Sequence, residues 1–287
     1  QFMLDTRLSD KDRHPLKIND LVIMDLDNEV APEKVVWAQS PELEWDSSVP
    51  NVGMSGDRFY RPMQCLGDMI EYTGAVMSID PAGRGQDETG YSIVKMLNGS
   101  LYVHDSGGLG GGYDEAVLEE LAYKAKKYKV NTIVVESNFG DGMFNQLMMP
   151  VLRRIYPCTM EEVRHNTQKE RRIIDTLEPV MNQHRLIIDP NVIKQDWETA
   201  QDYTPEKQLK YQLIYQLSRI TKDRGALVHD DRLDALSIAV NYWVEQMAQD
   251  ADEQIKNRKT EAIDAELERF KQAYYKCSGK EVTTTWM

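Results

Sequence analysis

At residues 74–80 the sequence reads Gly74-Ala75-Val76-Met77-Ser78-Ile79-Asp80, an apolar run that ends in an acidic residue and is followed by Pro81. Two more apolar runs, at 91–97 and 101–104, are separated by Asn98-Gly99. Because Asn-Gly favours the tight turn of a hairpin, the sequence predicts three strands, the last two of which form a hairpin. A glycine-rich run at 107–112 follows, and we predict a flexible loop there.

Beyond this point, predicted helices and strands alternate along the chain. Apolar residues at helical spacing predict helices at 113–128, 142–155, 168–182, 233–247 and 259–275. Short apolar runs predict strands at 132–135 and 186–188, whereas residues 206–220 fit either period and stay undecided. Antiparallel strands followed by alternating helices and strands predict an α/β fold, a mixed sheet with helices on both faces.

The composition divides the chain into three parts. Residues 1–70 contain five prolines and only short apolar runs, which predicts a linker or extended wrapping segment. Residues 71–247 carry the predicted sheet, and residues 248–287 read as a charged helical tail. A chain that begins with Gln1 also fits a piece of a longer polypeptide.

Composition narrows the class of protein. With 41% hydrophobic and 28% charged residues the chain can bury a core, which excludes wholesale disorder. Its three cysteines are widely spaced, so neither a disulfide framework nor a zinc cluster is indicated, and a reducing compartment is expected. No run of about 18 apolar residues occurs, so we expect a soluble protein without a membrane span.

Charge at first argues against a nucleic-acid partner. The chain has 34 basic and 47 acidic residues, a net charge of -13. DNA binding relies on cationic side chains. The stretch 164–224, however, has 11 basic and 9 acidic residues, a net +2, and it leads directly into an acidic cluster.

Acidic residues stand where such a sheet would expose them. Asp80 and Glu136 end predicted strands, and Asp230, Asp231 and Asp234 open a predicted helix. Strand ends gather ligands in α/β sheets, and carboxylates three residues apart on a helix repel unless a cation lies between them. Carboxylate oxygens are the ligands that Mg²⁺ prefers, so the pattern indicates a divalent-metal site.

Simpler explanations exist for most of these acids. Asp80 before Pro81 can form a turn, and Asp230 or Asp231 can cap a helix. Glu136 is harder to explain in this way, because burying an unpaired carboxylate after an apolar strand would be costly.

Three segments resemble a known family. They are Ser78-Ile79-Asp80-Pro81-Ala82-Gly83-Arg84, Val134-Val135-Glu136-Ser137-Asn138-Phe139-Gly140 and His229-Asp230-Asp231-Arg232-Leu233-Asp234-Ala235-Leu236. The third is the most specific. Together they resemble the nuclease domain of the large terminase subunit of tailed bacteriophages, most nearly that of short-tailed phages, over about residues 72–245.

The resemblance implies a ribonuclease H-like fold and metal-dependent endonuclease cutting of concatemeric double-stranded DNA during genome packaging. It implies an N-terminal ATPase motor in the full protein, and no phosphate-binding loop of the G-x-x-x-x-G-K-[ST] type occurs in this sequence. The implied partners are double-stranded DNA, the phage portal and the small terminase subunit, in the host cytoplasm. The tail at 248–287 is either a solvated helix or a portal-docking segment.

By the same resemblance Asp80, Glu136, Asp231 and Asp234 are the expected catalytic and metal-binding residues, with two Mg²⁺ or Mn²⁺ ions as cofactors. Our hypothesis is that Asp80 bridges both ions while Glu136 and one helix acid each hold one, for two-metal phosphodiester hydrolysis. Whether Asp230 or Asp231 contacts metal stays open. A junction resolvase of the same fold and a non-catalytic portal-docking module are the alternatives.

The expected DNA contacts are basic residues around this site: Arg84, Lys169, Arg172, Lys222 and Arg224. Each also fits an ordinary solvated surface. For the glycine-rich run at 107–112, a DNA-facing or gating role is the alternative to a flexible loop. Tyr211 could stack on bases, although core packing is the default, and His229 is expected to cap or pack rather than to bind metal.

Overall fold

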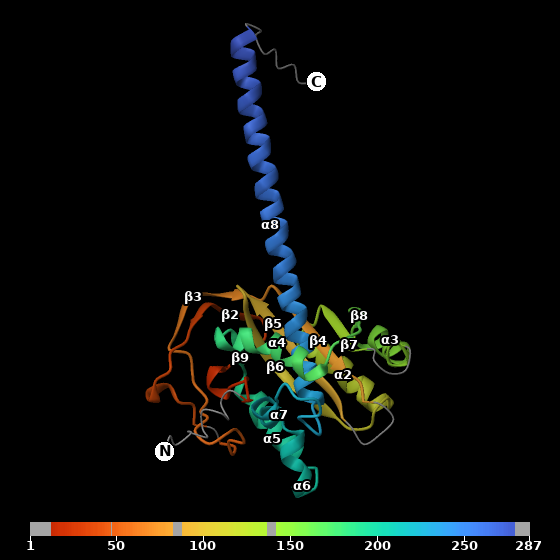
Figure 1. Ribbon diagram of the computed structural model, residues 1–287. Coiled ribbons are helices and arrows are strands. Elements are labelled where there is room, and N and C mark those ends of the chain that lie inside the picture. Colours follow the sequence, from red (N-terminus) through yellow and green to blue (C-terminus); the bar gives the residue numbers. More distant parts are fainter. Residues whose placement is uncertain (1–12, 47, 83–87, 137–141, 279–287) are drawn as a thin grey trace. The chain divides into compact units, whose positions relative to one another are not determined.

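The computed structural model describes residues 13–46, 48–82, 88–136 and 142–278. In this part of the chain, one mixed sheet has the strand order β1-β9-β6-β5-β4-β7-β8 (Figure 1). Its strands are β1 (Val22–Ile23), β4 (Gly74–Asp80), β5 (Thr89–Leu97), β6 (Ser100–Leu109), β7 (Thr132–Glu136), β8 (Thr159–Val163) and β9 (Leu186–Ile188).

The centre of the sheet is the predicted antiparallel unit. β5 pairs antiparallel with β4 on one side and with β6 on the other. Asn98 and Gly99 have φ angles of 49° and 79°, the left-handed conformation that a tight hairpin turn requires, so the predicted hairpin is confirmed. The prediction that a loop begins at residue 107 is wrong. Gly107 and Gly108 lie within β6, opposite Tyr91 and Gly90.

Parallel strands flank this unit on both sides. β7 pairs with β4 and β8 with β7, while β9 pairs with β6 and β1 with β9. The sequence did not indicate β8, since Glu161 and Glu162 interrupt its alternation and most of its residues are exposed. The mixed sheet expected from the sequence is confirmed.

Helices fill the connections. They are α2 (Glu115–Lys127), α3 (Met143–Ile155), α4 (Lys169–Asn182), α5 (Pro190–Ala200), α6 (Pro205–Gln208), α7 (Leu213–Arg219) and α8 (Asp231–Ser278). Short 3-10 turns are η1 (Ile18–Asp20), η2 (Pro41–Leu43) and η3 (Leu209–Tyr211). The undecided stretch 206–220 is therefore helical, and the two helices predicted at 233–247 and 259–275 are parts of α8.

The two faces of the sheet pack against different helices. Met77 and Ile79 of β4 belong to a buried apolar cluster with residues of α2 and α3, among them Leu121 and Met148. On the opposite face, the Ser78 hydroxyl donates to the carbonyl of Ala235 in the first turns of α8. Helices thus cover both faces, as the sequence predicts.

The segment before residue 70 differs from a simple linker. Strand β1 extends the main sheet, and β2 (Val30–Val36) pairs with β3 (Gln64–Glu71) in a separate two-stranded sheet. Val22 and Ala31 are buried with Leu97, Tyr102 and Ile187 in a second apolar cluster. This early segment is built into the same compact unit as the central strands because its apolar residues complete that cluster.

The chain forms two compact units, Gln1–Trp243 and Val244–Met287. The boundary between the units falls within α8, and the separate tail expected from residue 248 stays a prediction. Among the described residues, no helix is both long and apolar enough to cross a membrane.

Candidate metal centre

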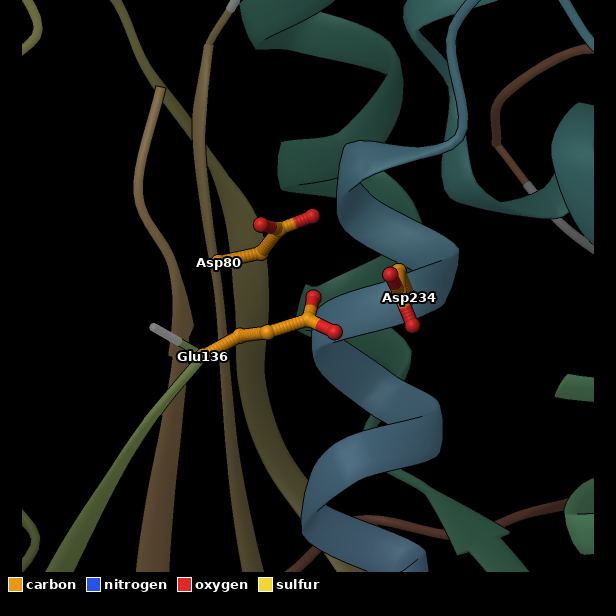
Figure 2. Close-up of side chains that lie close together, drawn as sticks. All are labelled: Asp80, Glu136 and Asp234. Atoms are coloured by element: carbon orange, nitrogen blue, oxygen red, sulfur yellow. The ribbon is translucent and has the colours of Figure 1, made fainter. Parts of the chain in front are cut away.

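Three carboxylates from distant parts of the chain meet at one edge of the sheet. Asp80 ends β4, Glu136 ends β7, and Asp234 lies in the first turn of α8. Each offers an oxygen within 4.8 Å of the other two. In Figure 2, Asp80 and Glu136 extend from the strands toward the helix that carries Asp234.

The strand register explains why two of these acids are neighbours. β4 and β7 run parallel with Ser78 opposite Val134 and Ile79 opposite Val135, so Asp80 and Glu136 come next along the two strands. Side chains alternate across a strand, and Ser78 faces α8. Asp80 and Glu136 therefore face α8 as well, where the Asp234 side chain has no exposed area.

Two cations from α4 neutralise this group. The ammonium of Lys169 lies 3.4 Å from Asp80 and 3.0 Å from Asp234. The guanidinium of Arg172 lies 3.3 Å from Glu136 and 2.8 Å from Asp234. Both side chains stand in the first turn of α4, where the helix dipole disfavours positive charge, so the three carboxylates must hold them there.

Burial shifts the protonation of these groups. Burial, helped by the carboxylates of Asp234 and Glu136 and opposed by Lys169, raises the pKa of Asp80 to about 7. For Lys169, burial by itself would lower the pKa, but Asp234, Asp80 and Asp230 together hold it above its usual value. The site thus attracts positive charge strongly and resists carrying three uncompensated negative charges.

The helix acids separate into different roles. Asp234 joins the carboxylate group, whereas Asp231, also described by the structure, is not one of its three members. Asp230 directly precedes α8, its carbonyl accepts from the amide of Asp234, and its carboxylate lies 2.9 Å from the Lys169 ammonium. The expectation that Asp231 binds metal stays a prediction without support from this geometry.

The basic residues expected to contact DNA fall into three groups. Lys169 and Arg172 lie on the acids, as described above. Lys222 and Arg224 are exposed on the segment that precedes α8, and the Lys222 carbonyl accepts from Gln168 at the start of α4. Arg84 lies outside the described residues.

The aromatic residues near the helix acids are packed. The Tyr211 ring stacks on Tyr203 at 3.9 Å and on His229 at 4.1 Å, and Tyr211 is 1% exposed. Both faces of the ring are covered, so the alternative in which Tyr211 stacks on bases is wrong, and His229 packs as the sequence predicts.

The sequence did not indicate that Lys169 and Arg172 pair with the acids. Their spacing of three residues does place them on one face of a helix. A buried acidic group needs nearby cations, and this paired spacing beside the predicted site was the available signal.

Comparison with known proteins relates the sequence of this chain to phage terminases. Residues 79–186 match the family described as "Terminase Bacteriophage T7, Ribonuclease H-like domain". The chain is 43% identical to the large terminase subunit of Enterobacteria phage T3 over 251 residues, and this aligned region is 88% of the chain. This chain is a relative of the phage terminase large subunit. It spans 43% of the T3 protein's length.

Solved terminase nuclease domains resemble this chain more distantly than the T3 protein does. The Mn-soaked human cytomegalovirus terminase nuclease domain is 12% identical, with a TM-score of 0.43 over 59% of this chain and 83% of that chain. The nuclease domain of the large terminase subunit of bacterial virus Sf6 is also 12% identical, with a TM-score of 0.41 over 59% of this chain and 88% of that one. The assignment of a ribonuclease H-like domain to this chain rests on the family match at residues 79–186.

Proposed function

We propose that this chain is a divalent-metal-dependent DNA endonuclease, the nuclease part of a phage terminase large subunit that cuts concatemeric double-stranded DNA during genome packaging. The observation that carries the proposal is the convergence of Asp80, Glu136 and Asp234 within 4.8 Å at the ends of two strands and one helix. The 43% identity to the T3 large terminase subunit supports the substrate and the process.

The residues present fit a hard divalent cation. All three donors are carboxylates, which Mg²⁺ and Mn²⁺ prefer, and the group already holds two cationic side chains in place. We propose Asp80, Glu136 and Asp234 as the ligands of one or two such ions. When bound, these ions would activate water and offset the negative charge that develops on the phosphate.

Lys169 and Arg172 have different parts in this proposal. Arg172 is 10% exposed and contacts both Glu136 and Asp234, so it orients these two carboxylates. Lys169 is 36% exposed and touches Asp80, Asp230 and Asp234, so it neutralises the acids before an ion binds. Its ammonium then becomes available to a DNA phosphate.

DNA reaches this centre in our proposal over the basic residues near α4 and α8. Lys222 and Arg224 are exposed just before α8 and could contact phosphates without disturbing the buried acids. Arg84, outside the described residues, and Asp231 keep their expected roles as a DNA contact and an additional metal ligand within this proposal.

The direct test is cleavage of linear double-stranded DNA with Mn²⁺ or Mg²⁺. We expect nicks and breaks that depend on the ion, and loss of cleavage in Asp80→Asn. Asp175→Asn is the matched control, because Asp175 is an exposed acid of α4 outside the carboxylate group. Full activity of Asp80→Asn would contradict the ligand assignment.

A branched DNA substrate separates the endonuclease from a resolvase. Equal or better cleavage of linear duplex supports the packaging nuclease, whereas cleavage confined to branched DNA would assign a resolvase instead. No cleavage of either substrate, with folded protein, would favour a non-catalytic docking module.

The wider setting follows from the same relationship. We propose that the chain works beside an ATPase motor, the portal and the small terminase subunit, in the host cytoplasm. A pull-down of the full-length protein with portal and small subunit tests these partners one at a time.

A further inference from the structure

A second charged cluster, formed by Arg232, Glu88 and Asp196, is buried and includes a residue two positions before Asp234. Arg232, between Asp231 and Asp234 in sequence, has no exposed area. Its guanidinium donates to both oxygens of Glu88, at 2.9 and 2.8 Å, and to Asp196 at 2.9 Å. Nothing in the proposed chemistry uses these three residues.

The cluster joins three elements. Arg232 belongs to the first turn of α8, Asp196 to α5, and Glu88 directly precedes β5. Asp196 also accepts the backbone amides of Leu213 and Ile214 at the start of α7. Its carboxylate therefore fixes α5, α7 and α8 to one another.

Glu88 is held from a second side. The Tyr203 hydroxyl donates to Glu88 at 2.6 Å. A Cβ atom added to Gly108 would lie 1.9 Å from a Glu88 carboxylate oxygen, so glycine at this position of β6 leaves the room that the carboxylate occupies. Asp80 and Glu88 are eight positions apart in the sequence. Asp80 is one of the three carboxylates, and Glu88 belongs to the charged cluster around Arg232.

β5 and α8 also approach one another closely. A Cβ atom added to Gly90 would lie 2.3 Å from the carbonyl oxygen of Asp231. The atom it would meet belongs to the backbone of α8, so no side chain could rotate away to relieve the clash. The first turn of α8 is therefore seated on β5 at a distance that glycine alone allows.

Net stability does not explain such a cluster. Buried ion pairs cost much of their attraction in lost hydration, and apolar residues of similar size often stabilise a core as well. An arginine held on both edges, however, donates in fixed directions and sets the position of its own backbone. Asp234 is two residues from Arg232, about 3 Å along the helix axis, so the position of one determines that of the other.

We propose that Arg232, held by Glu88 and Asp196, is a positioning residue that seats the first turn of α8 against β5 and thereby places Asp234 opposite Asp80 and Glu136. This role rests on the proposed function, since it concerns the geometry of the same metal centre. Arg232 itself touches neither the three carboxylates nor, in this proposal, the substrate.

The test measures Mn²⁺ binding rather than cleavage alone. Arg232→Lys keeps the charge but loses the two-sided contact, and Gly90→Ala pushes α8 from β5 without removing any charge. Loss of a group that orients metal ligands typically weakens metal binding about 10- to 100-fold, and we expect that range in both variants. The electron paramagnetic resonance spectrum of bound Mn²⁺ should change as well, since the ligand geometry changes.

Two controls separate positioning from general destabilisation. Asp105→Asn removes another buried carboxylate, which lies 2.9 Å from the Lys124 ammonium and belongs neither to the three carboxylates nor to the contacts of Arg232. This variant should lower the melting temperature but leave the Mn²⁺ affinity unchanged. Gly110→Ala adds a Cβ atom that meets nothing within 4 Å, and should change neither.

The outcomes distinguish this inference from the proposed function. Wild-type affinity and spectrum in folded Arg232→Lys and Gly90→Ala would overturn the positioning role alone. An equal loss of Mn²⁺ affinity in Asp105→Asn, at matched melting temperature, would overturn it too. A wild-type chain that binds no Mn²⁺ would instead contradict the proposed function, and the positioning role with it.

Discussion

At the scale of single residues, the three carboxylates were predictable and their cations were not. Asp80 and Glu136 follow apolar strands, and an acid at such a place indicates a site from the amino-acid order alone. For the helix acids the sequence predicts only that Asp231 and Asp234 are neighbours. Which of the two faces the sheet depends on how α8 is seated, and that depends on contacts such as Gly90 with Asp231, which spacing does not reveal.

Lys169→Met tests whether the ammonium neutralises the acids. Without it, Asp80 and Asp234 repel one another at low dielectric, so the metal-free variant should lose about 1–2 kcal/mol of unfolding free energy, a modest value because the side chain is 36% exposed. Added Mn²⁺ should raise its melting temperature more than that of the wild type. Thermal unfolding with and without Mn²⁺ measures both, and an equal Mn²⁺ effect on the two proteins would count against this role.

Burial of His104, which is not one of the three carboxylates, predicts that the stability of the fold depends on pH. Burial, helped by Lys95 and opposed by Asp27, lowers the pKa of His104 to about 3 in the folded chain. In the unfolded chain His104 takes up a proton near the ordinary pKa of about 6.5. Below that pH protonation stabilises the unfolded chain but not the folded one, so the free energy of unfolding falls as the pH drops from about 6.5 toward 3.

The variant His104→Phe lacks this titrating group, so its unfolding free energy should not show this pH dependence. Between pH 7 and pH 5 the wild type should lose about 2 kcal/mol more unfolding free energy than the variant. Urea unfolding at the two pH values provides the comparison. Equal losses in both proteins would show that His104 titrates normally in the folded chain.

At the scale of elements, the central strands were predictable because their apolar runs and the Asn98-Gly99 turn agree. β1 was missed because it has only two residues. β2 was missed because it contains Pro32, and β3 because nearly all of its residues are exposed. In 206–220 both periods fit, and the contacts of Asp196 with the amides of Leu213 and Ile214 favour the helix α7. Such contacts between distant segments leave no local signal.

Ser78→Ala tests the contact between β4 and α8. The Ser78 side chain is fully buried and its hydroxyl donates to the Ala235 carbonyl, so its loss should lower the unfolding free energy by about 1 kcal/mol. Ser55→Ala, at an exposed turn, is the control and should have little effect. Chemical denaturation of the three proteins measures the difference, and identical midpoints would mean that this bond contributes nothing.

At the scale of the whole molecule, the net charge of -13 was a poor guide to partners until it was divided along the chain. Part of the acidic excess forms the carboxylate centre, and two of the basic residues near α4 neutralise it rather than form a free surface. The linker expected up to residue 70 also belongs to the first compact unit, because its apolar residues pack only once the sheet exists.

Truncation after Met247 tests the division of the chain. All three carboxylates, Lys169 and Arg172 belong to the unit Gln1–Trp243, so the shortened chain should keep the Mn²⁺ affinity and the melting temperature of the full chain. Calorimetry of both proteins measures this. A clear loss of Mn²⁺ affinity would show that the helical unit supports the metal centre.

The most direct measurement is the anomalous scattering of a crystal soaked in Mn²⁺. We predict one or two ions bound by Asp80, Glu136 and Asp234, with the Lys169 ammonium withdrawn from the carboxylates of Asp80 and Asp234 that it contacts in the structure. A soaked crystal in which Lys169 keeps these contacts and no anomalous peak lies between the three acids would contradict the metal-dependent nuclease.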